Sequence, residues 1–119
     1  MTDTQKEQRA KAFMRSSGFC PICKKIISEG QMQYAHKIGN REIYRKKYGS
    51  WIIDHTLNGE MVCSLSCNNS VDVGSSYGNH LDVIADILIY EFVQMWGEQG
   101  LIKLTDKVLE KYKQMGVQI

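Results

Sequence analysis

Four cysteines in two close pairs are the residues of this sequence best suited to chemistry. The spacings are C-x2-C and C-x3-C, and the pairs are Cys20 with Cys23 and Cys63 with Cys67. Two short-gap pairs of thiolates are a common ligand set for a tetrahedral Zn²⁺ ion, because each tight turn supplies two ligands. We therefore predict one structural zinc bound by all four cysteines. Such a zinc has no open position for a substrate, so catalysis would have to involve other residues.

Composition and charge describe a globular chain of one domain's length. The 119 residues are 43% hydrophobic and 24% charged, with a formal net charge of +2. Disordered chains have fewer apolar residues, and no apolar run approaches the roughly 20 residues of a membrane-spanning helix. The N-terminal segment lacks the apolar stretch of a signal peptide. We therefore expect a cytoplasmic protein, bacterial or phage-encoded, whose thiols favour metal ligation over disulfides.

Histidine and asparagine residues hold regular places relative to the cysteine pairs. The stretches CPIC, YAHKI, NGEMVC and CNN follow one another within residues 20–72, with His36 in the second. Asn58 stands five residues before Cys63, and Asn68 follows the last cysteine directly. In these motifs the sequence resembles the HNH nucleases of the ββα-metal type. That family places its first histidine at the end of a strand, in a segment such as AHI or DHI.

The resemblance implies hydrolysis of DNA phosphodiester bonds, with a role for each motif residue. His36 would be the general base, because a neutral histidine can take the proton of a water molecule near pH 7. Asn58 would brace the loop and help to orient that histidine. Asn68 would offer its amide oxygen to a catalytic cation, Mg²⁺ or Mn²⁺, at the scissile phosphate.

One departure from the HNH pattern leaves the second ligand of this cation open. Many relatives bind the cation through an Asp or His directly before the first histidine, but that position is Ala35 here. We favour His55 as the replacement, because it lies near Asn58 in the connecting segment. Asp54 and Asp72 are the alternates.

The C-x3-C gap is a second departure. It sets Cys63 and Cys67 four residues apart, so that both could project from one face at the start of a helix. The additional residue also shifts the register of that helix. Asn69 could therefore take the role that we assign to Asn68.

Basic residues gather between the two cysteine pairs. We expect contacts with DNA phosphates from Lys37, Arg41, Arg45, Lys46 and Lys47. The C-terminal half carries compensating acids, so the positive charge is concentrated around the motif residues. Phosphate contacts of this kind give salt-sensitive affinity that depends little on base sequence.

Helices and strands have to bring these segments together, and periodicity with capping signals predicts them. Thr4 and Glu7 have the spacing of a capping box, and Gly18 is placed to end the helix that they would begin. The expected order is a helix over 4–16, a strand over 31–36, a helix over 40–48, a strand shortly before residue 63, and helices over 64–72, 79–96 and 103–114.

The last two expected helices each have an apolar stripe. In 79–96 apolar residues recur at steps of three and four, and in 103–114 one face holds Leu104, Val108, Leu109 and Tyr112. Core packing is the interpretation that we favour for both stripes. An interface between two copies of the chain is the alternative for part of them.

Together these patterns predict an α+β fold in a single domain over residues 1–119. Its parts would be a ββα-metal HNH core over 20–72 stapled by the four-cysteine zinc, an N-terminal helix within 1–19 and a C-terminal helical hairpin within 79–119. The expected function is a metal-dependent HNH endonuclease acting on DNA, in phage processing, restriction or homing. The alternative is a non-catalytic zinc-ribbon module for DNA binding or regulation. The expected partners are DNA and, as one option, a second copy through the C-terminal helices, but no membrane.

Overall fold

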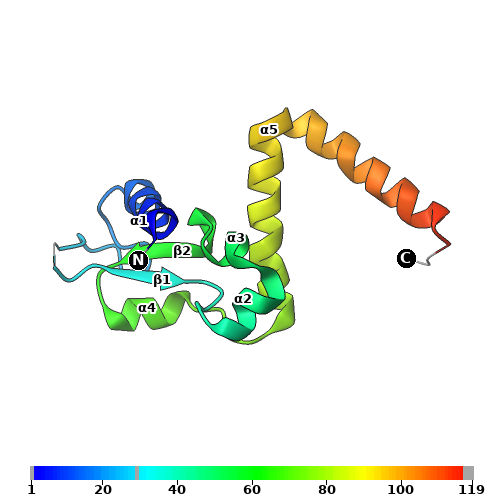
Figure 1. Ribbon diagram of the computed structural model, residues 1–119. Helices are drawn as coiled ribbons and strands as arrows, with labels where there is room; N and C mark the ends of the chain where they lie inside the picture. The colour runs from blue at the N-terminus through cyan, green and yellow to red at the C-terminus, as the bar shows by residue number, and fades with distance from the viewer. Residues whose placement is uncertain (1, 29, 117–119) are drawn as a thin grey trace. The chain divides into compact units, whose positions relative to one another are not determined.

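The computed structural model describes residues 2–28 and 30–116, and it combines helices with a small sheet (Figure 1). In chain order the elements are α1 (Asp3–Ser16), β1 (Gln33–His36), α2 (Glu42–Tyr48), α3 (Ser50–Ile53), the 3-10 helix η1 (Thr56–Asn58), β2 (Gly59–Val62), α4 (Leu65–Val71) and α5 (Tyr77–Gln114). An antiparallel sheet among helices agrees with the expected α+β class. No helix in the described part of the chain is both long and apolar enough to cross a bilayer.

Contacts within the chain divide it into two compact units. The first unit ends at Ile87 and the second begins at Leu88, so the boundary falls inside α5. All four cysteines and the three motif residues of the sequence analysis belong to the first unit. We had expected a single domain over residues 1–119.

β1 and β2 pair as a two-stranded antiparallel sheet between two helices. We call this strand pair the hairpin, although α2, α3 and η1 connect its strands. The register pairs Gln33 with Val62, Tyr34 with Met61, Ala35 with Glu60 and His36 with Gly59. Because side chains alternate along a strand, Tyr34 and His36 lie on one face of β1. Helices α1 and α4 lie on opposite sides of the strands (Figure 1), and the Arg9 guanidinium stands over the Tyr34 ring at 5.3 Å from its centroid. Helix α1 therefore covers the face of the sheet to which His36 belongs.

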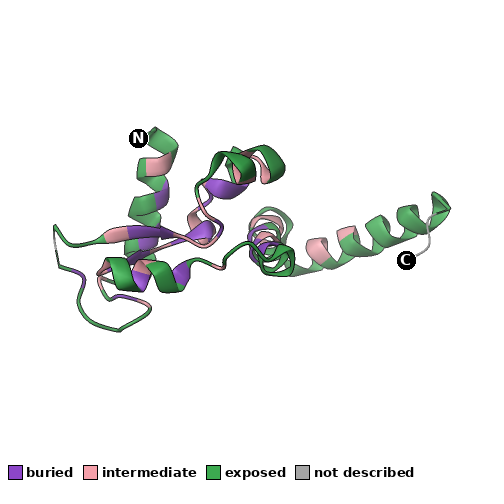
Figure 2. Ribbon diagram, turned by 90° about the horizontal axis from the view of Figure 1, so that it is seen from below, coloured by how far each residue is buried: buried purple, intermediate pink, exposed green. Residues whose placement is uncertain are grey.

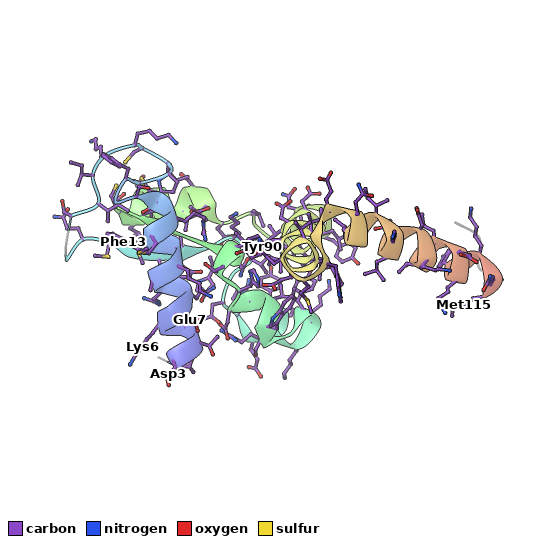
Figure 3. All side chains as sticks on the ribbon, turned by 90° about the horizontal axis from the view of Figure 1, so that it is seen from above. Asp3, Lys6, Glu7, Phe13, Tyr90 and Met115 are labelled. Carbon is purple, nitrogen blue, oxygen red and sulfur yellow. The ribbon has the colours of Figure 1, made fainter. Side chains whose placement is uncertain are left out.

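Helix α1 begins two residues earlier than its expected capping box. Thr2 is the N-cap and forms the box with Gln5, whereas we had assigned this role to Thr4 and Glu7. Both pairs have spacing three, and the local hydrogen bonds of Thr2 decide between them. The helix ends at Ser17, which has a left-handed conformation with φ 56°. Lys6 and Glu7 lie in its first turns and are exposed (Figure 3).

Polar side chains attach α1 to the segment between α3 and β2. The buried Gln8 amide donates to the carbonyl oxygens of Ile53 and His55 at 3.2 and 2.8 Å. Arg15 donates to the carbonyl oxygens of Thr56 and Gly59 at 3.1 and 2.7 Å. These bonds join side chains of α1 to backbone carbonyls of a segment more than 40 residues later in the chain, so they position α1 specifically.

Two apolar clusters stabilise the first unit, and Figure 2 shows their buried residues on the strands and the adjoining helices. The cluster around the hairpin contains Ala12, Cys20, Ile27, Tyr34, Ala35, Met61, Val62, Cys67 and Val71. The other contains Ile38, Ile52, Ile53, Val83 and Ile87. Two of the four cysteines are thus part of the core, which couples any metal site to the packing of the hairpin.

The second unit differs from the expected hairpin of two helices joined by a loop. Residues 98–102, which we had expected to connect them, are helical, and only Gly97 departs from helical geometry with φ 71° and ψ 176°. A glycine adopts positive φ at little cost, so one residue is enough to interrupt the helix. Much of the expected core stripe is exposed, with Val108 at 57% and Leu109 at 46%.

Candidate functional site

The four cysteines form a cluster that matches a tetrahedral metal site. Their sulfur atoms all lie within 4.8 Å of one another, and they are the one group of three or more metal-ligating His, Cys, Asp or Glu residues among the described residues. The Cys23 and Cys63 sulfurs are 3.3 Å apart, and the Cys63 and Cys67 sulfurs 3.9 Å apart. A zinc ion bound at about 2.3 Å by four thiolates would separate them by roughly 3.8 Å. No disulfide joins these cysteines, and their arrangement fits a structural metal such as zinc.

A tight turn holds the first cysteine pair. The Lys24 N–H donates to the carbonyl of Cys20 at 2.9 Å, and the Cys20 N–H donates to the carbonyl of Lys25 at 2.8 Å. Lys24 has φ 68°, a conformation that few residues other than glycine adopt. A bridge between Phe19 and Ile26 closes the turn. The turn therefore directs the side chains of both Cys20 and Cys23 toward the cysteine cluster.

The second pair does not lie on one helix, as the C-x3-C gap had suggested. Cys63 directly follows β2, and only Cys67 belongs to α4. Ser64 is the N-cap of α4, and its hydroxyl accepts from the Cys67 N–H at 3.2 Å. The longer gap therefore accommodates a capping residue between the strand that supplies one ligand and the helix that supplies the other.

The surroundings of the sulfurs favour one ionised thiol. Burial of Cys20 opposes ionisation, but backbone N–H groups of Cys23, Cys63 and Ile22 outweigh it and lower the pKa of Cys20 to about 6. In the absence of a metal charge, hydrogen bonds from the Cys23 side chain and burial raise the pKa of Cys63 to about 12. Four thiolates so close together need a cation to neutralise them, which is the role of zinc in such a site.

His36 lies at the other end of the hairpin, in a partly buried position. Its ring meets the Tyr34 ring edge to face, with 4.9 Å between centroids. Burial lowers the pKa of His36 from its ordinary 6.5, Arg9 and Arg45 lower it further, and Asp54 opposes them. The imidazole is therefore neutral near pH 7, the form that can accept a proton.

Asp54 and Arg45 form a bidentate ion pair near this histidine. The two guanidinium nitrogens of Arg45 donate to the two carboxylate oxygens at 3.1 and 2.6 Å. Hydrogen bonds from Arg45 hold the pKa of Asp54 below its ordinary value. Arg45 also donates to the Asn40 amide oxygen at 2.6 Å. Binding of a cation by Asp54, one of the alternate ligands, would compete with this ion pair. Contact of Arg45 with a DNA phosphate would compete with it as well.

Asn58 is fully buried, and its side chain joins the two segments that flank the hairpin. Its Oδ1 accepts from the Ile38 N–H at 2.8 Å, and its Nδ2 donates to the carbonyls of Ile38 and Ile53 at 3.0 Å each. The Asn58 carbonyl accepts from the Lys37 N–H at 2.7 Å. These are the bracing contacts that the resemblance implied, and they hold the backbone directly after His36.

Asn68 and His36 are not brought together. The Asn68 amide donates to the Gln33 side-chain oxygen at 3.3 Å, and Gln33 is the first residue of β1 whereas His36 is the last. Three strand residues correspond to roughly 10 Å. Asn69, the alternative that the long gap left open, is exposed on α4. Asn68 is thus placed near the cysteine end of the hairpin.

The other predicted cation ligands have structural contacts of their own. His55 is buried, and its Nδ1 accepts from the Leu57 N–H at 3.1 Å as the cap of η1. Asp72 follows α4, and its carboxylate accepts from the Gly74 N–H at 2.7 Å. The residue after Asp72 donates its backbone N–H to the carbonyl of Lys37 at 2.9 Å, so the chain next to Asp72 is tied to the segment that follows His36.

The remaining predicted DNA contacts differ in how they are engaged. Lys37 lies 3.7 Å from the Glu60 carboxylate, and the exposed Lys46 lies 3.0 Å from Glu42. Arg41 and Lys47 stack on the tyrosine rings of α2, and Lys47 also stands 4.8 Å from the centroid of the Tyr77 ring. The contacts of the exposed Arg41, Lys46 and Lys47 are weak enough to be exchanged for phosphate oxygens.

The sequence analysis assigned no functional role to Arg9 or Tyr34, two residues on the same face of the sheet as His36. Arg9 lies within the helix expected over residues 4–16, and nothing local indicates that its charge acts on His36. Tyr34 is buried, and its hydroxyl has no hydrogen-bond partner among the described residues. Its ring covers Gly59, where any larger side chain would overlap the Tyr34 hydroxyl. The YAH segment was the one available signal, since residues two apart on a strand share a face.

Comparison with known proteins identifies no relative. No protein family, no curated protein and no solved structure matches this chain. The functional argument therefore depends on the residues and their geometry.

Proposed function

We propose that this chain is an HNH-type DNA endonuclease that hydrolyses phosphodiester bonds with His36 as the general base. The observation that carries the proposal is the environment of His36 at the end of β1. A histidine kept neutral by burial and by two nearby guanidinium groups is suited to accept a proton close to a bound phosphate. The order β1, β2, α4 around a cysteine cluster is also the order of the ββα motif that the sequence resembles.

In the proposed reaction His36 takes a proton from water as the water oxygen attacks phosphorus. The bond from phosphorus to the 3′ oxygen breaks, and the leaving oxygen receives a proton from solvent. Arg9 contributes positive charge on the same face. Asn58 keeps the segment after His36 in place through its bonds to the Ile38 backbone. Positioning and charge compensation of this kind are the main contributions of a protein to phosphoryl chemistry.

The catalytic cation needs a separate test. Around His36 the described residues do not gather three His, Cys, Asp or Glu side chains into a ligand group. Mg²⁺ retains several waters and can be held by one carboxylate together with substrate phosphates. We therefore assign no step to a cation, and its requirement is part of the experiment.

Nicking of supercoiled plasmid tests the proposal. Wild-type protein, His36→Ala and Gln33→Ala are compared with Mg²⁺, with Mn²⁺ and with no divalent ion added. We expect nicking by the wild type and by Gln33→Ala, which alters the opposite end of β1, and a loss of at least about 100-fold in His36→Ala. Bound zinc and circular dichroism of each variant show that the fold is retained.

Two outcomes would refute the nuclease proposal. One is a zinc-loaded, folded wild type that nicks no plasmid with any ion. The other is a His36→Ala variant that nicks as fast as Gln33→Ala.

A zinc-stabilised DNA-binding module without catalysis is the second candidate. The missing ligand group around His36 favours it, as does the commitment of Asn68 to Gln33. Under this alternative the protein binds duplex DNA with a strong salt dependence and does not cut it. Gel-shift titrations of the same variants measure DNA binding separately from cleavage, and His36→Ala should bind as well as wild type under either candidate. Nicking of the bound plasmid by the wild type is then the result that distinguishes the two.

A further inference from the structure

The second unit exposes apolar side chains along both parts of α5. Before Gly97 the exposed ones include Ile89, Met95 and Trp96, at 51%, 65% and 54%. After Gly97 they include Ile102 and Val108, at 47% and 57%. Met115, just beyond the end of α5 in Figure 3, is 75% exposed. Single exposed apolar residues are ordinary, but a series of this length on one helical unit indicates a binding surface.

The apolar residues after Gly97 belong to one side of the helix. Leu101, Leu104, Val108 and Tyr112 recur at steps of three and four, and Ile102 and Leu109 border them. The opposite side carries Lys103, Asp106, Lys107, Glu110 and Gln114. Such a division is the pattern of a helix that packs its apolar side against another element. We call this apolar side, together with Leu88, Ile89, Met95 and Trp96, the α5 stripe.

A hollow borders the stripe where the helix is interrupted. Its lining residues are Trp96, Gln99, Gly100, Lys103 and Leu104, and its volume is about 480 Å³. Trp96 and Leu104 give it apolar walls. A hollow of this size accepts a large apolar side chain, the kind of anchor around which protein interfaces are organised.

Charge along the unit is divided at the same point. Residues 88–98 contain the two acids Glu91 and Glu98 and no lysine or arginine. Residues 99–114 contain four lysines, Lys103, Lys107, Lys111 and Lys113, against the two acids Asp106 and Glu110. If a second copy lies antiparallel on this unit, the acidic part of each faces the lysine-rich part of the other.

We propose that the α5 stripe is a self-association surface, on which a second copy of this chain packs in antiparallel orientation about a twofold axis. An isologous interface requires a surface complementary to itself, and the reversal of charge at Gly97 provides this. A partner with only positive charge would be repelled by the lysine-rich residues 99–114, and a partner with only negative charge would be repelled by the acidic residues 88–98. A second copy in antiparallel orientation offers the opposite charge to each part. The proposal is independent of the nuclease activity, because it concerns only association.

Sedimentation velocity of the full chain tests the proposal over a wide range of concentration. We expect the wild type to approach twice its 13.6 kDa mass. Val108→Lys places a charge in the stripe and should weaken dimerisation about tenfold or more. Gln114→Lys adds the same side chain on the polar side and should dimerise like wild type. Because Val108 is exposed in the single chain, helicity should be equal in both variants.

Charge reversal separates this arrangement from unspecific apolar association. Lys111→Glu with Lys113→Glu, at the two borders of the stripe, should weaken the dimer, and so should Glu91→Lys with Glu98→Lys. The chain that combines all four substitutions should regain wild-type association, because the two reversed parts again face each other. A monomeric wild type, equal association of Val108→Lys and Gln114→Lys, or no recovery in the fourfold variant would each overturn the proposal.

Discussion

The two ends of the β1–β2 hairpin are built differently. At one end, two short segments supply all four cysteines. At the other end, the charged side chains that act on His36 come from elements spread over the first 58 residues. The cysteine end needs only two turns and a helix cap to place its ligands. The histidine end needs α1, α2 and the segment around Asp54 to pack correctly. Local spacing therefore identifies the first site, but packing creates the second. Substitutions should separate the two ends by the size and kind of their effects.

The largest effect is expected at the cysteine end. Cys20→Ser removes a buried ligand, and zinc binding and folding are coupled in small metal-stapled domains. We expect a loss of roughly 4 kcal/mol or more in the free energy of unfolding, with less than one zinc per chain. Urea unfolding and metal analysis measure both. Ser66→Ala, which lies between the second cysteine pair, is the control and should match wild type. A zinc-free Cys20→Ser chain of native stability would contradict the structural metal.

Asn58→Ala should have the next largest effect, at the histidine end. The substitution leaves the Ile38 N–H and the carbonyls of Ile38 and Ile53 without their partner in a buried site. A cost of roughly 2–4 kcal/mol follows from unpaired buried polar groups. Zinc content should remain at one ion per chain, because the cysteines lie at the other end. The control is the exposed Asn69→Ala. If Asn58→Ala releases zinc, the two ends are coupled more strongly than their geometry indicates.

A smaller effect is expected from His36, in the pH dependence of the free energy of unfolding. Its pKa is lower in the folded chain than its ordinary 6.5, so the folded state binds fewer protons between these two values. The contribution to stability is complete above the ordinary pKa and is lost as the pH falls through the folded pKa. His36→Gln should therefore flatten the acid-side fall in the free energy of unfolding. Urea titrations from about pH 7.5 to 5 measure it, with Gln33→Ala retaining the wild-type profile.

The smallest effect is expected on the exposed cations. Lys46 pairs only with Glu42 one turn away, with both side chains more than 70% exposed. Lys46→Ala should leave stability unchanged, because exposed pairs of this kind contribute little. If Lys46 contacts a phosphate, the slope of log affinity against log salt falls by about one. Arg45→Ala is the contrast, since it should reduce stability by removing the partner of Asp54. Equal stability losses in the two variants would contradict this difference.

The residues that the HNH resemblance assigns to one site are not all grouped together. The Asn58 side chain bonds the Ile38 backbone, whereas Asn68, which was expected beside the same phosphate as His36, contacts Gln33. The sequence could not fix the position of the Asn68 amide, because it depends on Ser64, and not Cys63, being the N-cap of α4.

The α5 segment shows the same limit for apolar patterns. Periodicity predicted its helices, and the apolar stripe of residues 103–114 is present. Core packing was nevertheless the wrong expectation for Val108 and Leu109, which are exposed. A stripe indicates that a helix packs against something, but its partner can lie within the chain or on another copy.

The sequence by itself determined the four-cysteine metal cluster, the α+β class and most helix and strand positions, because turn, capping and periodicity signals act within a few residues. Only the tertiary structure decided that burial, together with Arg9 and Arg45, lowers the pKa of His36 and that Asp54 is paired with Arg45. The same holds for the separation of Asn68 from His36. These relations join residues up to 35 positions apart, and their strength depends on burial and distance, which no local pattern records.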